Sequence, residues 1–382
     1  NREPLSTSVS QLYIKGKGDP WLVPERVWQM VRQFRMLGIS EITGDIIIDD
    51  SWFSGSGLAI GSEQDDSTQA YMAESAALSV GFNVIQISVR PNTKVDLPAR
   101  VLIEPIADNI VIDSNVTTVE SGKSEISVDV IEDKGGSRVI IDGRVNVNDS
   151  GFTYWRKIFN PSLHAGFVFK KMFEDSGIQV LGGVKIGKTT AELPRIVKYQ
   201  SPRLGDLIAS VNRYSNNFMA SQIARTIGAE MSGAVGTWMS GKKAMDDFLQ
   251  NQLKFTKNSY QINNASGLHD VNRVTPGQVV KLLTFVAQSP KLKVDYLHSL
   301  AVAGDEGTLF DKLLNTVGEH NLRGKTGSLS VASALSGYIT TKDGDDLVFS
   351  FMVNHFQHGI TPVRNLQEKL VLILASLGQK NG

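Results

Sequence analysis

The segment GGVKIGKT, residues 182–189, matches the phosphate-binding pattern G-x-x-x-x-G-K-[ST] at every position. In that pattern the glycines let backbone N–H groups surround the phosphates, and the lysine reaches the outermost ones. This chemistry needs a buried strand before the pattern and a helix that begins inside it. The sequence instead predicts one half-buried strand running through the motif from Val180, and Pro194 stops any later helix within two turns. We therefore interpret the match as fortuitous.

Ser215 and Asn217 form a second group of polar residues, in the segment NRYSNNFMASQIARTIG. A helix is predicted at 201–214, with Ser201 as its N-cap and Pro202 at its first position, and FMASQIARTIG begins another helix. The sequence therefore places residues 215–217 in a tight joint between two helices. Helix capping accounts for Ser and Asn at such a joint, so this motif alone does not indicate catalysis.

A third group, Lys325-Thr326-Gly327-Ser328, precedes a run of small and β-branched residues that predicts a strand. The segment DDLVFSFMVNHF, after the Asp-Gly-Asp turn at 343–345, predicts its hairpin partner. A lysine and a threonine near a strand start can be an ordinary exposed edge. Glycine in a strand marks a close approach by a ligand or another backbone, so Gly327 is the residue that points to binding.

In this order, S-x-N and K-T-G resemble two of the three elements of the penicillin-recognising serine enzymes, the other being S-x-x-K. Further stretches narrow the resemblance to the low-molecular-mass class C penicillin-binding proteins. These are D-alanyl-D-alanine carboxypeptidase/endopeptidases of the penicillin-binding protein 4 type, peptidase family S13. The stretches are YIKGKGDPWLVPERVWQMV, EITGDIIIDDSWF, AESAALSVGFNV, INNASGLHDVNRVTP and AVAGDEGTL, so the resemblance covers nearly the whole chain. β-Lactamases share the motifs but lack the long stretch ahead of S-x-N.

The resemblance implies catalytic roles for three residues. Such enzymes attack the D-Ala-D-Ala amide with an activated serine, and water then hydrolyses the acyl-enzyme. Ser215 would pass a proton towards the leaving nitrogen, and Asn217 would bind the substrate amide and steady the lysine of the nucleophile. Lys325 would face the terminal carboxylate with its positive charge.

The resemblance also implies how the substrate binds. Thr326 and Ser328 would offer hydroxyls to the carboxylate or the peptide. The strand from Gly327 would pair with the peptide backbone and lend an N–H to the oxyanion hole. The expected partners are peptidoglycan peptide stems and β-lactam antibiotics, with no cofactor and no metal. The family usually has an acidic residue where Asn264 stands, so no role is carried over to that position.

The nucleophile motif does not lie where the resemblance requires it. The single S-x-x-K in the chain, Ser240 to Lys243, comes after S-x-N, inside a segment whose apolar spacing predicts a surface helix. We therefore expect the nucleophilic serine and its lysine upstream of residue 1. The alternative is a non-catalytic peptidoglycan-binding member of the family that keeps the cleft and lacks the nucleophile.

The elements that must position these residues fall into three regions that differ in their predicted secondary structure. The fold class implied by the resemblance is α+β, with an antiparallel sheet flanked by helices and two nested inserted domains. Residues 198–382 would form most of the peptidase domain, whose N-terminal part is not in the sequence. Residues 1–90 and 149–197 would form an inserted mixed α/β domain. A small all-β domain at 91–148 would be nested in that one. A C-terminal helix is predicted from near Val363.

Composition excludes several classes of protein. The 382 residues are 41% hydrophobic and 20% charged, which suits two or three domains with real cores. Lys+Arg and Asp+Glu are both 39, so the basic excess of a nucleic-acid binder is missing. The absence of cysteine excludes disulfides and a Cys nucleophile, but suits cytosol and periplasm alike.

Two other groups of residues give only weak signals for a metal or cation site. The pair His355 and His358 has no third metal ligand, and the acidic cluster Asp45, Asp49 and Asp50 is interpreted as a solvated strand end. The resemblance implies a periplasmic location and at most peripheral membrane association.

Overall fold

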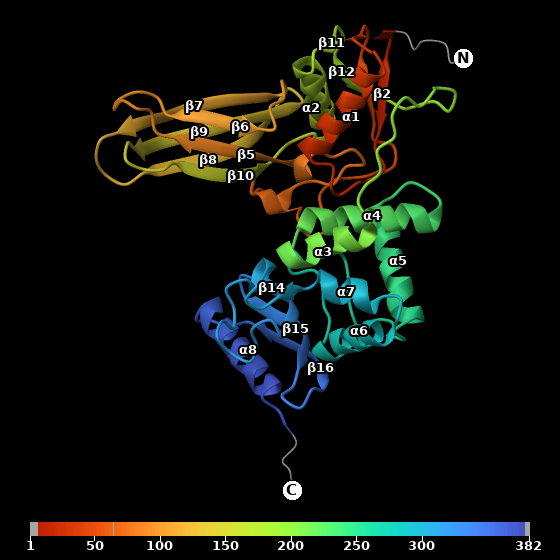
Figure 1. Cartoon of the computed structure of the whole chain (residues 1–382), viewed down its shortest axis with the longest axis vertical. Helices are drawn as coiled ribbons and strands as arrows, with labels where there is room; N and C mark the ends of the chain where they lie inside the picture. Colours follow the sequence, from red (N-terminus) through yellow and green to blue (C-terminus); the bar gives the residue numbers. More distant parts are fainter. Residues whose placement is uncertain (1–6, 64, 379–382) are drawn as a thin grey trace. The chain divides into compact units, whose positions relative to one another are not determined.

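The computed structural model describes residues 7–63 and 65–378 (Figure 1). Contacts within the chain divide it into two compact units. The first runs to Ser201 and also takes in Ser221–Gly241. The second contains Pro202–Ala220 and the chain from Lys242 onward. The candidate residues Ser215, Asn217 and 325–328 therefore all belong to the second unit.

The first unit begins with a mixed part made of short parallel strands and two helices. Its strands form two three-stranded sheets, ordered β1-β3-β11 and β12-β4-β2. The bounds are β1 (Ser8–Val9), β2 (Leu12–Lys15), β3 (Glu41–Ile42), β4 (Ile46–Asp49), β11 (Gln179–Val180), β12 (Val184–Ile186), α1 (Pro24–Met36), α2 (Pro161–Asp175) and the 3₁₀ turns η1 (Ala70–Met72) and η2 (Gly81–Asn83). In the sequence, Pro24 near a helix start and the helical spacing of Val27, Met30, Val31 and Phe34 predict a helix. It is confirmed as α1, with its proline in the first turn.

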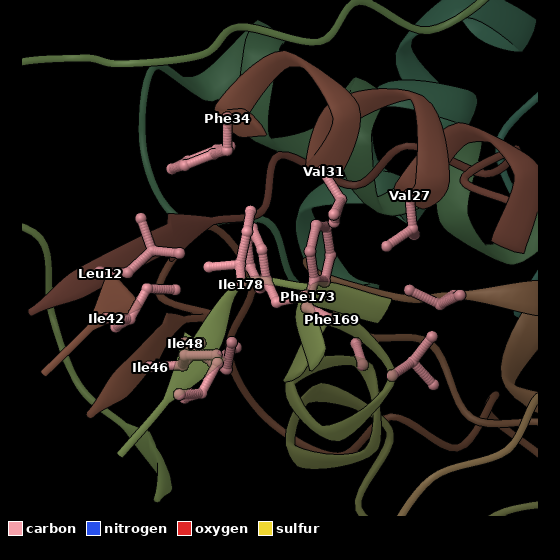
Figure 2. Close-up of a cluster of buried hydrophobic side chains, with 14 of the residues drawn as sticks. Leu12, Val27, Val31, Phe34, Ile42, Ile46, Ile48, Phe169, Phe173 and Ile178 are labelled. Atoms are coloured by element: carbon pink, nitrogen blue, oxygen red, sulfur yellow. The ribbon is translucent and has the colours of Figure 1, made fainter. Parts of the chain in front are cut away.

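Apolar side chains of α1 and α2 form the core of this part with residues of the short strands (Figure 2). Val27, Val31 and Phe34 recur at helical spacing and are all buried. The ring of Phe34 meets that of Phe173 edge to face, with the ring centroids 5.2 Å apart. The 3.6-residue period of the sequence thus becomes a packed face.

Phe173 is 1% exposed, so we expect Phe173→Ala to lower the free energy of unfolding by about 3–5 kcal/mol through lost burial and an unfilled cavity. Urea unfolding of the purified protein measures this. Met36→Ala on α1, at an 81% exposed side chain, is the matched control and should change the value by no more than about 0.5 kcal/mol. Equal losses in the two variants would contradict the packing described here.

The segment GGVKIGKT, residues 182–189, lies in this part of the first unit. The prediction that one strand runs through it from Val180 is wrong. Residues 179–186 form two short strands, β11 against β3 and β12 against β4, which belong to different sheets. The chain passes between the sheets at Gly182, where a Cβ would lie 2.2 Å from the carbonyl oxygen of Gly44. Close backbone packing accounts for that glycine. No helix follows until Leu204, so the motif has no helix N-terminus for phosphates.

The acidic cluster beside this motif is not a solvated strand end, as the sequence suggested. Asp49 is fully buried and accepts N–H groups from Ser51 at 3.0 Å and Thr189 at 2.9 Å. Burial alone would raise the pKa of the Asp49 carboxyl, but these hydrogen bonds outweigh it and hold the pKa far below its usual range. Asp50 accepts the N–H of Leu78 at 2.9 Å. The cluster ties the end of β4 to neighbouring loops.

The rest of the first unit is rich in antiparallel strands. Two three-stranded sheets, β10-β5-β6 and β7-β9-β8, share a hydrophobic cluster of their own. The bounds are β5 (Val84–Arg90), β6 (Arg100–Glu104), β7 (Ile110–Val119), β8 (Glu125–Asp133), β9 (Gly136–Asn146) and β10 (Phe152–Lys157). The nested division of this unit stays a proposal. It is supported by the two separate cores, although β5 and β10 lie outside the predicted range 91–148.

The second unit is built on a four-stranded antiparallel sheet in the order β13-β14-β15-β16 (Figure 1). Its strands are β13 (Ala301–Val302), β14 (Arg323–Leu329), β15 (Ala332–Thr340) and β16 (Asp346–Asn354). The predicted hairpin is confirmed as β15 and β16, paired from Ala332 with Asn354 to Thr340 with Asp346. Successive residues of β15 face opposite sides: Leu335 and Ile339 pack with α8, and Tyr338 packs with residues of α6. The predicted sheet flanked by helices is confirmed.

The helices of the second unit are α3 (Leu204–Tyr214), α6 (Pro276–Gln288), α7 (Lys293–Ser299) and α8 (Ile360–Ala375), with the 3₁₀ turn η3 (Gly307–Leu309). Helices α4 (Asn217–Ser232) and α5 (Trp238–Asn251) have residues in both units. Helix α3 begins two residues later than predicted, because Arg203 is still extended at ψ 147° and serves as its N-cap in place of Ser201. Helix α8 begins at Ile360, before the predicted Val363. Pro362 is tolerated there because the first-turn N–H groups have no intrahelical partner.

No helix within the described ranges is long and apolar enough to cross a bilayer. Within the same ranges, no three His, Cys, Asp or Glu side chains are grouped so that they could hold a metal ion.

Candidate active site

The joint between α3 and α4 presents two polar side chains and uses a third for capping. Ser215 ends α3 in the left-handed conformation, at φ 54° and ψ 46°. The side chain of Asn216 accepts the N–H of Met219 at 3.0 Å, which is the N-cap interaction of α4. Capping therefore needs only the middle residue of Ser-Asn-Asn. Ser215 and Asn217 stay available, and Asn217 makes no side-chain hydrogen bond within the described part of the chain.

Lys325 on β14 meets this joint. Its Nζ donates to Ser215 Oγ at 2.8 Å and to the carbonyl oxygen of Thr326 at 2.8 Å. Burial lowers the pKa of the Lys325 ammonium to about 8. No carboxylate among the described residues pairs with it. The structure thus brings two of the sequence-predicted residues, 110 positions apart, into direct contact and leaves a half-buried cation without an anion.

The outer edge of β14 is open beside this lysine. β15 pairs with all of β14, whereas β13 pairs only with Arg323 and Gly324. From Lys325 onward, that edge has no strand partner within the described residues, so an extended peptide could add to it. A Cβ at Gly327 would lie 3.6 Å from Ala334 Cβ, an ordinary contact. The fold therefore does not require glycine at position 327, and its missing side chain leaves room for an approaching group.

The two hydroxyls that follow the lysine are each held by a residue that the sequence did not single out. Thr326 Oγ1 is hydrogen-bonded to Thr308 Oγ1 at 2.9 Å, and Arg364 donates to Ser328 Oγ at 2.8 Å. Thr308 lies in the AVAGDEGTL stretch, which resembled the family without an assigned role. Arg364, the fifth residue of α8, had no sequence signal.

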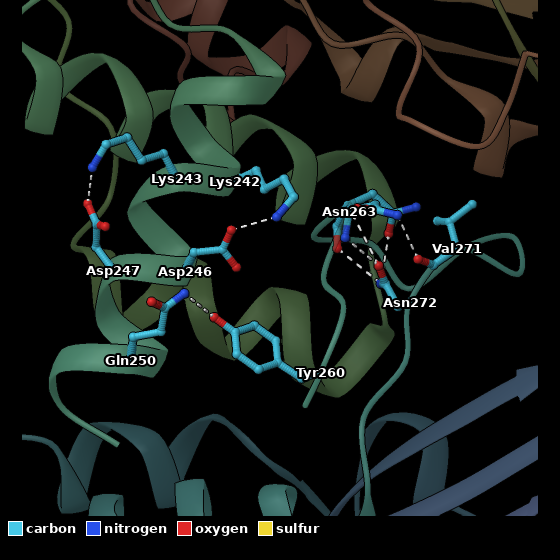
Figure 3. A network of polar contacts seen from close by, with 10 residues as sticks. Lys242, Lys243, Asp246, Asp247, Gln250, Tyr260, Asn263, Val271 and Asn272 are labelled. Atoms are coloured by element: carbon cyan, nitrogen blue, oxygen red, sulfur yellow. Dashed lines mark hydrogen bonds and ion pairs between the residues drawn. The ribbon is translucent and has the colours of Figure 1, made fainter. Parts of the chain in front are cut away.

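The single S-x-x-K of the chain is used for helix structure, and Figure 3 shows the ion pair of its lysine, Lys243, with Asp247. Ser240 Oγ accepts the N–H of Thr237 at 2.9 Å, and Thr237 Oγ1 accepts the N–H of Ser240 at 3.0 Å. This reciprocal pair caps α5. Lys243 binds Asp247 at 2.5 Å, as Lys242 binds Asp246 at 2.5 Å. Neither Ser240 nor Lys243 is free to act as a nucleophile or its base.

The NNASGL loop is also held by its own polar residues (Figure 3). Asn264 is 2% exposed, donates to the carbonyl oxygen of Leu268 at 2.9 Å and accepts the N–H of Gly267 at 2.9 Å. Asn272 donates to Asn264 at 3.1 Å. A carboxylate at position 264 could not donate to Leu268, so asparagine here fits a loop-forming role.

Comparison with solved structures identifies the fold. The chain superposes on penicillin binding protein 4 (dacB) from Haemophilus influenzae with a TM-score of 0.84 and 21% identity, covering 99% of this chain and 85% of that one. The same protein complexed with a novel β-lactam gives a TM-score of 0.77 at 19% identity, covering 99% of this chain and 84% of that one. The fold is therefore that of a penicillin-binding protein.

Sequence comparison gives the family. A D-alanyl-D-alanine carboxypeptidase from Actinomadura sp. (strain R39) is 29% identical over 381 residues, 96% of this chain and 69% of that protein. D-alanyl-D-alanine carboxypeptidase DacB from Haemophilus influenzae is 24% identical over 356 residues, 91% of this chain and 72% of that protein. The model of the D-Ala-D-Ala carboxypeptidase 3 (S13) family matches residues 6–377, and the chain belongs to that family. The predicted class, a serine-type D-Ala-D-Ala carboxypeptidase, is confirmed.

Proposed function

We propose that this protein cleaves the D-Ala-D-Ala ends of peptidoglycan peptide stems, their D-Ala cross-links, or both, through an acyl-enzyme that β-lactams also form. The observation that carries the proposal is the 2.8 Å contact between Lys325 Nζ and Ser215 Oγ. It joins the S-x-N and K-T-G motifs at an open strand edge, and family membership gives the class of reaction.

In this proposal the stem peptide binds as an added strand on the edge of β14. Its terminal carboxylate lies near Lys325, with the hydroxyls of Thr326 and Ser328 as further donors. The half-buried ammonium favours an anion because little water screens the attraction. The backbone at Gly327, free of a side chain, contributes an N–H to the oxygen that becomes negative during acylation.

Ser215 and Asn217 act on the other side of the scissile bond in the same proposal. Ser215 Oγ, which accepts a hydrogen bond from Lys325, hands its own proton to the leaving nitrogen and is reprotonated through Lys325. Asn217 binds the substrate amide with its side-chain carboxamide. The acylated serine and its lysine are expected outside the 382 residues, because Ser240 and Lys243 are engaged in α5.

We also propose that the protein works outside the cytoplasm, in the periplasm. The support is chemical: the substrate of the proposed reaction is a cell-wall polymer, and the relatives from Actinomadura and Haemophilus carry the name of a D-alanyl-D-alanine carboxypeptidase.

Incubating the full-length protein with a fluorescent penicillin, followed by peptide mapping, tests the proposal. We expect one labelled serine in an S-x-x-K motif other than 240–243, with labelling unchanged in Ser240→Ala. Ser215→Ala should slow labelling roughly tenfold, since a hydrogen bond to a charged group contributes about 1.5–3 kcal/mol. Label on Ser240, or no label when intact mass shows the expected serine to be present, would contradict the proposal.

A further inference from the structure

We propose that residues 304–309, called here the clasp, position the S-x-N joint and the K-T-G strand relative to each other, with Glu306 and Thr308 as positioning residues. The inference rests on the proposed function of Ser215 and Lys325. The clasp lies between β13 and the segment that leads to β14, and Leu309, 3% exposed, anchors it in the hydrophobic core. Glu306 and Thr308 lie outside that core, so apolar packing does not account for them.

One side of the clasp holds the end of α3. Arg213, two residues before Ser215, donates to Glu306 at 2.9 Å, and the two side chains are only 17% and 29% exposed. Gly307 lies directly against the carbonyl of Arg213: a Cβ there would be 2.4 Å from that oxygen, and φ is +65°. Only glycine allows this approach. The last turn of α3 is therefore fixed to the clasp by both a side-chain pair and a backbone contact.

The end of α3 is also bonded to α7. We therefore infer that its contacts with the clasp serve to orient it. Arg213 also donates to the carbonyl oxygen of His298. Asn212 donates to Ser299 Oγ at 2.7 Å. These bonds tie α3 to α7, whereas Glu306 and Gly307 set its direction relative to the strand that carries Lys325.

The other side of the clasp holds Thr326. Thr308 Oγ1 and Thr326 Oγ1 are 2.9 Å apart. A hydroxyl has one proton and can turn to suit its partner. When a carboxylate binds, Thr326 must donate to it, and Thr308 can then donate to Thr326. Thr308 thus keeps the Thr326 hydroxyl aimed at the anion and supplies its second hydrogen bond.

The contacts close a ring. From Ser215, the last turn of α3 leads to the contacts of Arg213 with Glu306 and Gly307. The clasp then leads to Thr308, which is hydrogen-bonded to Thr326. The neighbour of Thr326, Lys325, donates to Ser215 and completes the ring. Proton transfer needs heavy atoms about 2.6–3.2 Å apart, and a misplacement of about 1 Å can cost on the order of a hundredfold in rate. A ring of short contacts restrains the Ser215–Lys325 distance from both sides.

Thr308 is tested by substitution at both ends of its hydrogen bond in the full-length protein. We expect Thr308→Val to lower the second-order rate of penicillin acylation roughly threefold to tenfold, and Thr308→Ser to restore it. In a Thr326→Val background, Thr308→Val should cause no further loss, because its partner is gone. Thr340→Val is the matched control: it removes a bond of 2.9 Å to Asp346 at the far end of β15 and should leave acylation unchanged.

Glu306 is tested in the same way against Ser215. Glu306→Gln should slow acylation about tenfold, and much less in a Ser215→Ala background. Additive losses in both double variants, or losses that only follow a fall in melting temperature, would overturn the clasp. If Glu306→Gln does not fold, the Thr308 series decides alone. Full activity of Lys325→Ala would overturn the proposed function. If Lys325→Ala loses activity while Thr308→Val and Glu306→Gln acylate at the wild-type rate, only the proposed role of the clasp is overturned.

Discussion

Lys325→Ala in the full-length protein is expected to lower both peptide turnover and penicillin acylation about tenfold to a hundredfold. The reason is the loss of the proposed charge-assisted contact between Lys325 and the substrate carboxylate, since such a contact contributes roughly 1.5–3 kcal/mol. Stability at pH 7 should not fall. Burial lowers the pKa of the Lys325 ammonium from 10.5 in the unfolded chain to about 8. The charged form is therefore disfavoured by folding, and alanine relieves that cost. Acylation rates and a thermal melt measure the two effects.

Lys369→Ala is the matched control, since Lys369 is an exposed lysine of α8 with no part in the proposed site. It should change neither rate nor melting temperature appreciably. Wild-type acylation in Lys325→Ala, or a rate loss that only follows unfolding, would remove the reason for placing the active site at Ser215 and Lys325.

The second large effect is a loss of acylation at high pH. The pKa of Lys325 is about 8, so its charge disappears as the pH rises through that value. The second-order acylation rate reports the free enzyme, and it should fall about tenfold for each pH unit above roughly 8. A bound carboxylate favours the charged lysine and raises its pKa, so the fall in kcat should begin at a higher pH than the fall in kcat/KM.

Lys325→Arg separates this charge effect from other titrations. A guanidinium stays charged across the range, so the variant should lose the fall above pH 8, although its rate at pH 7 should be lower because its geometry differs. The stability of the wild type should rise between about pH 8 and 10.5, where the unfolded chain binds more protons than the folded one. If the acylation rate of Lys325→Arg falls with the same midpoint pH and the same slope as that of the wild type, Lys325 is not the group whose titration causes the fall.

Local patterns predicted the local elements of this chain. The apolar spacing of Val27, Val31 and Phe34 predicted α1, and the glycine turn at 343–345 predicted the hairpin of β15 and β16. Each of these signals lies within a few residues, as do the interactions that form a helix turn or a hairpin. The ordered S-x-N and K-T-G motifs, with the surrounding stretches, were sufficient to indicate the S13 family.

Local patterns failed where a neighbouring segment decided the outcome. The alternation at 179–186 predicted one strand. The chain instead changes sheets at Gly182, because the strands that it pairs with, β3 and β4, belong to different sheets. Asp49 looked solvated in the sequence and is buried, because Ser51 and the distant Thr189 satisfy its carboxylate. An acidic residue can be buried only where donors surround it, and the sequence does not say which donors will be near.

The sequence by itself determined the candidate residues of the proposed site: Ser215, Asn217 and the group from Lys325 to Ser328. The tertiary structure alone decided that Lys325 contacts Ser215 across 110 positions and that burial lowers the pKa of Lys325. It also decided that Thr308 contacts Thr326 and that Glu306 pairs with Arg213. Residue types and spacing encode turns, caps and strand faces, whose interactions are local. Distances between such elements, and the burial that shifts a pKa, arise only when the sheet and helices pack together, because desolvation and long-range hydrogen bonds depend on the whole folded unit.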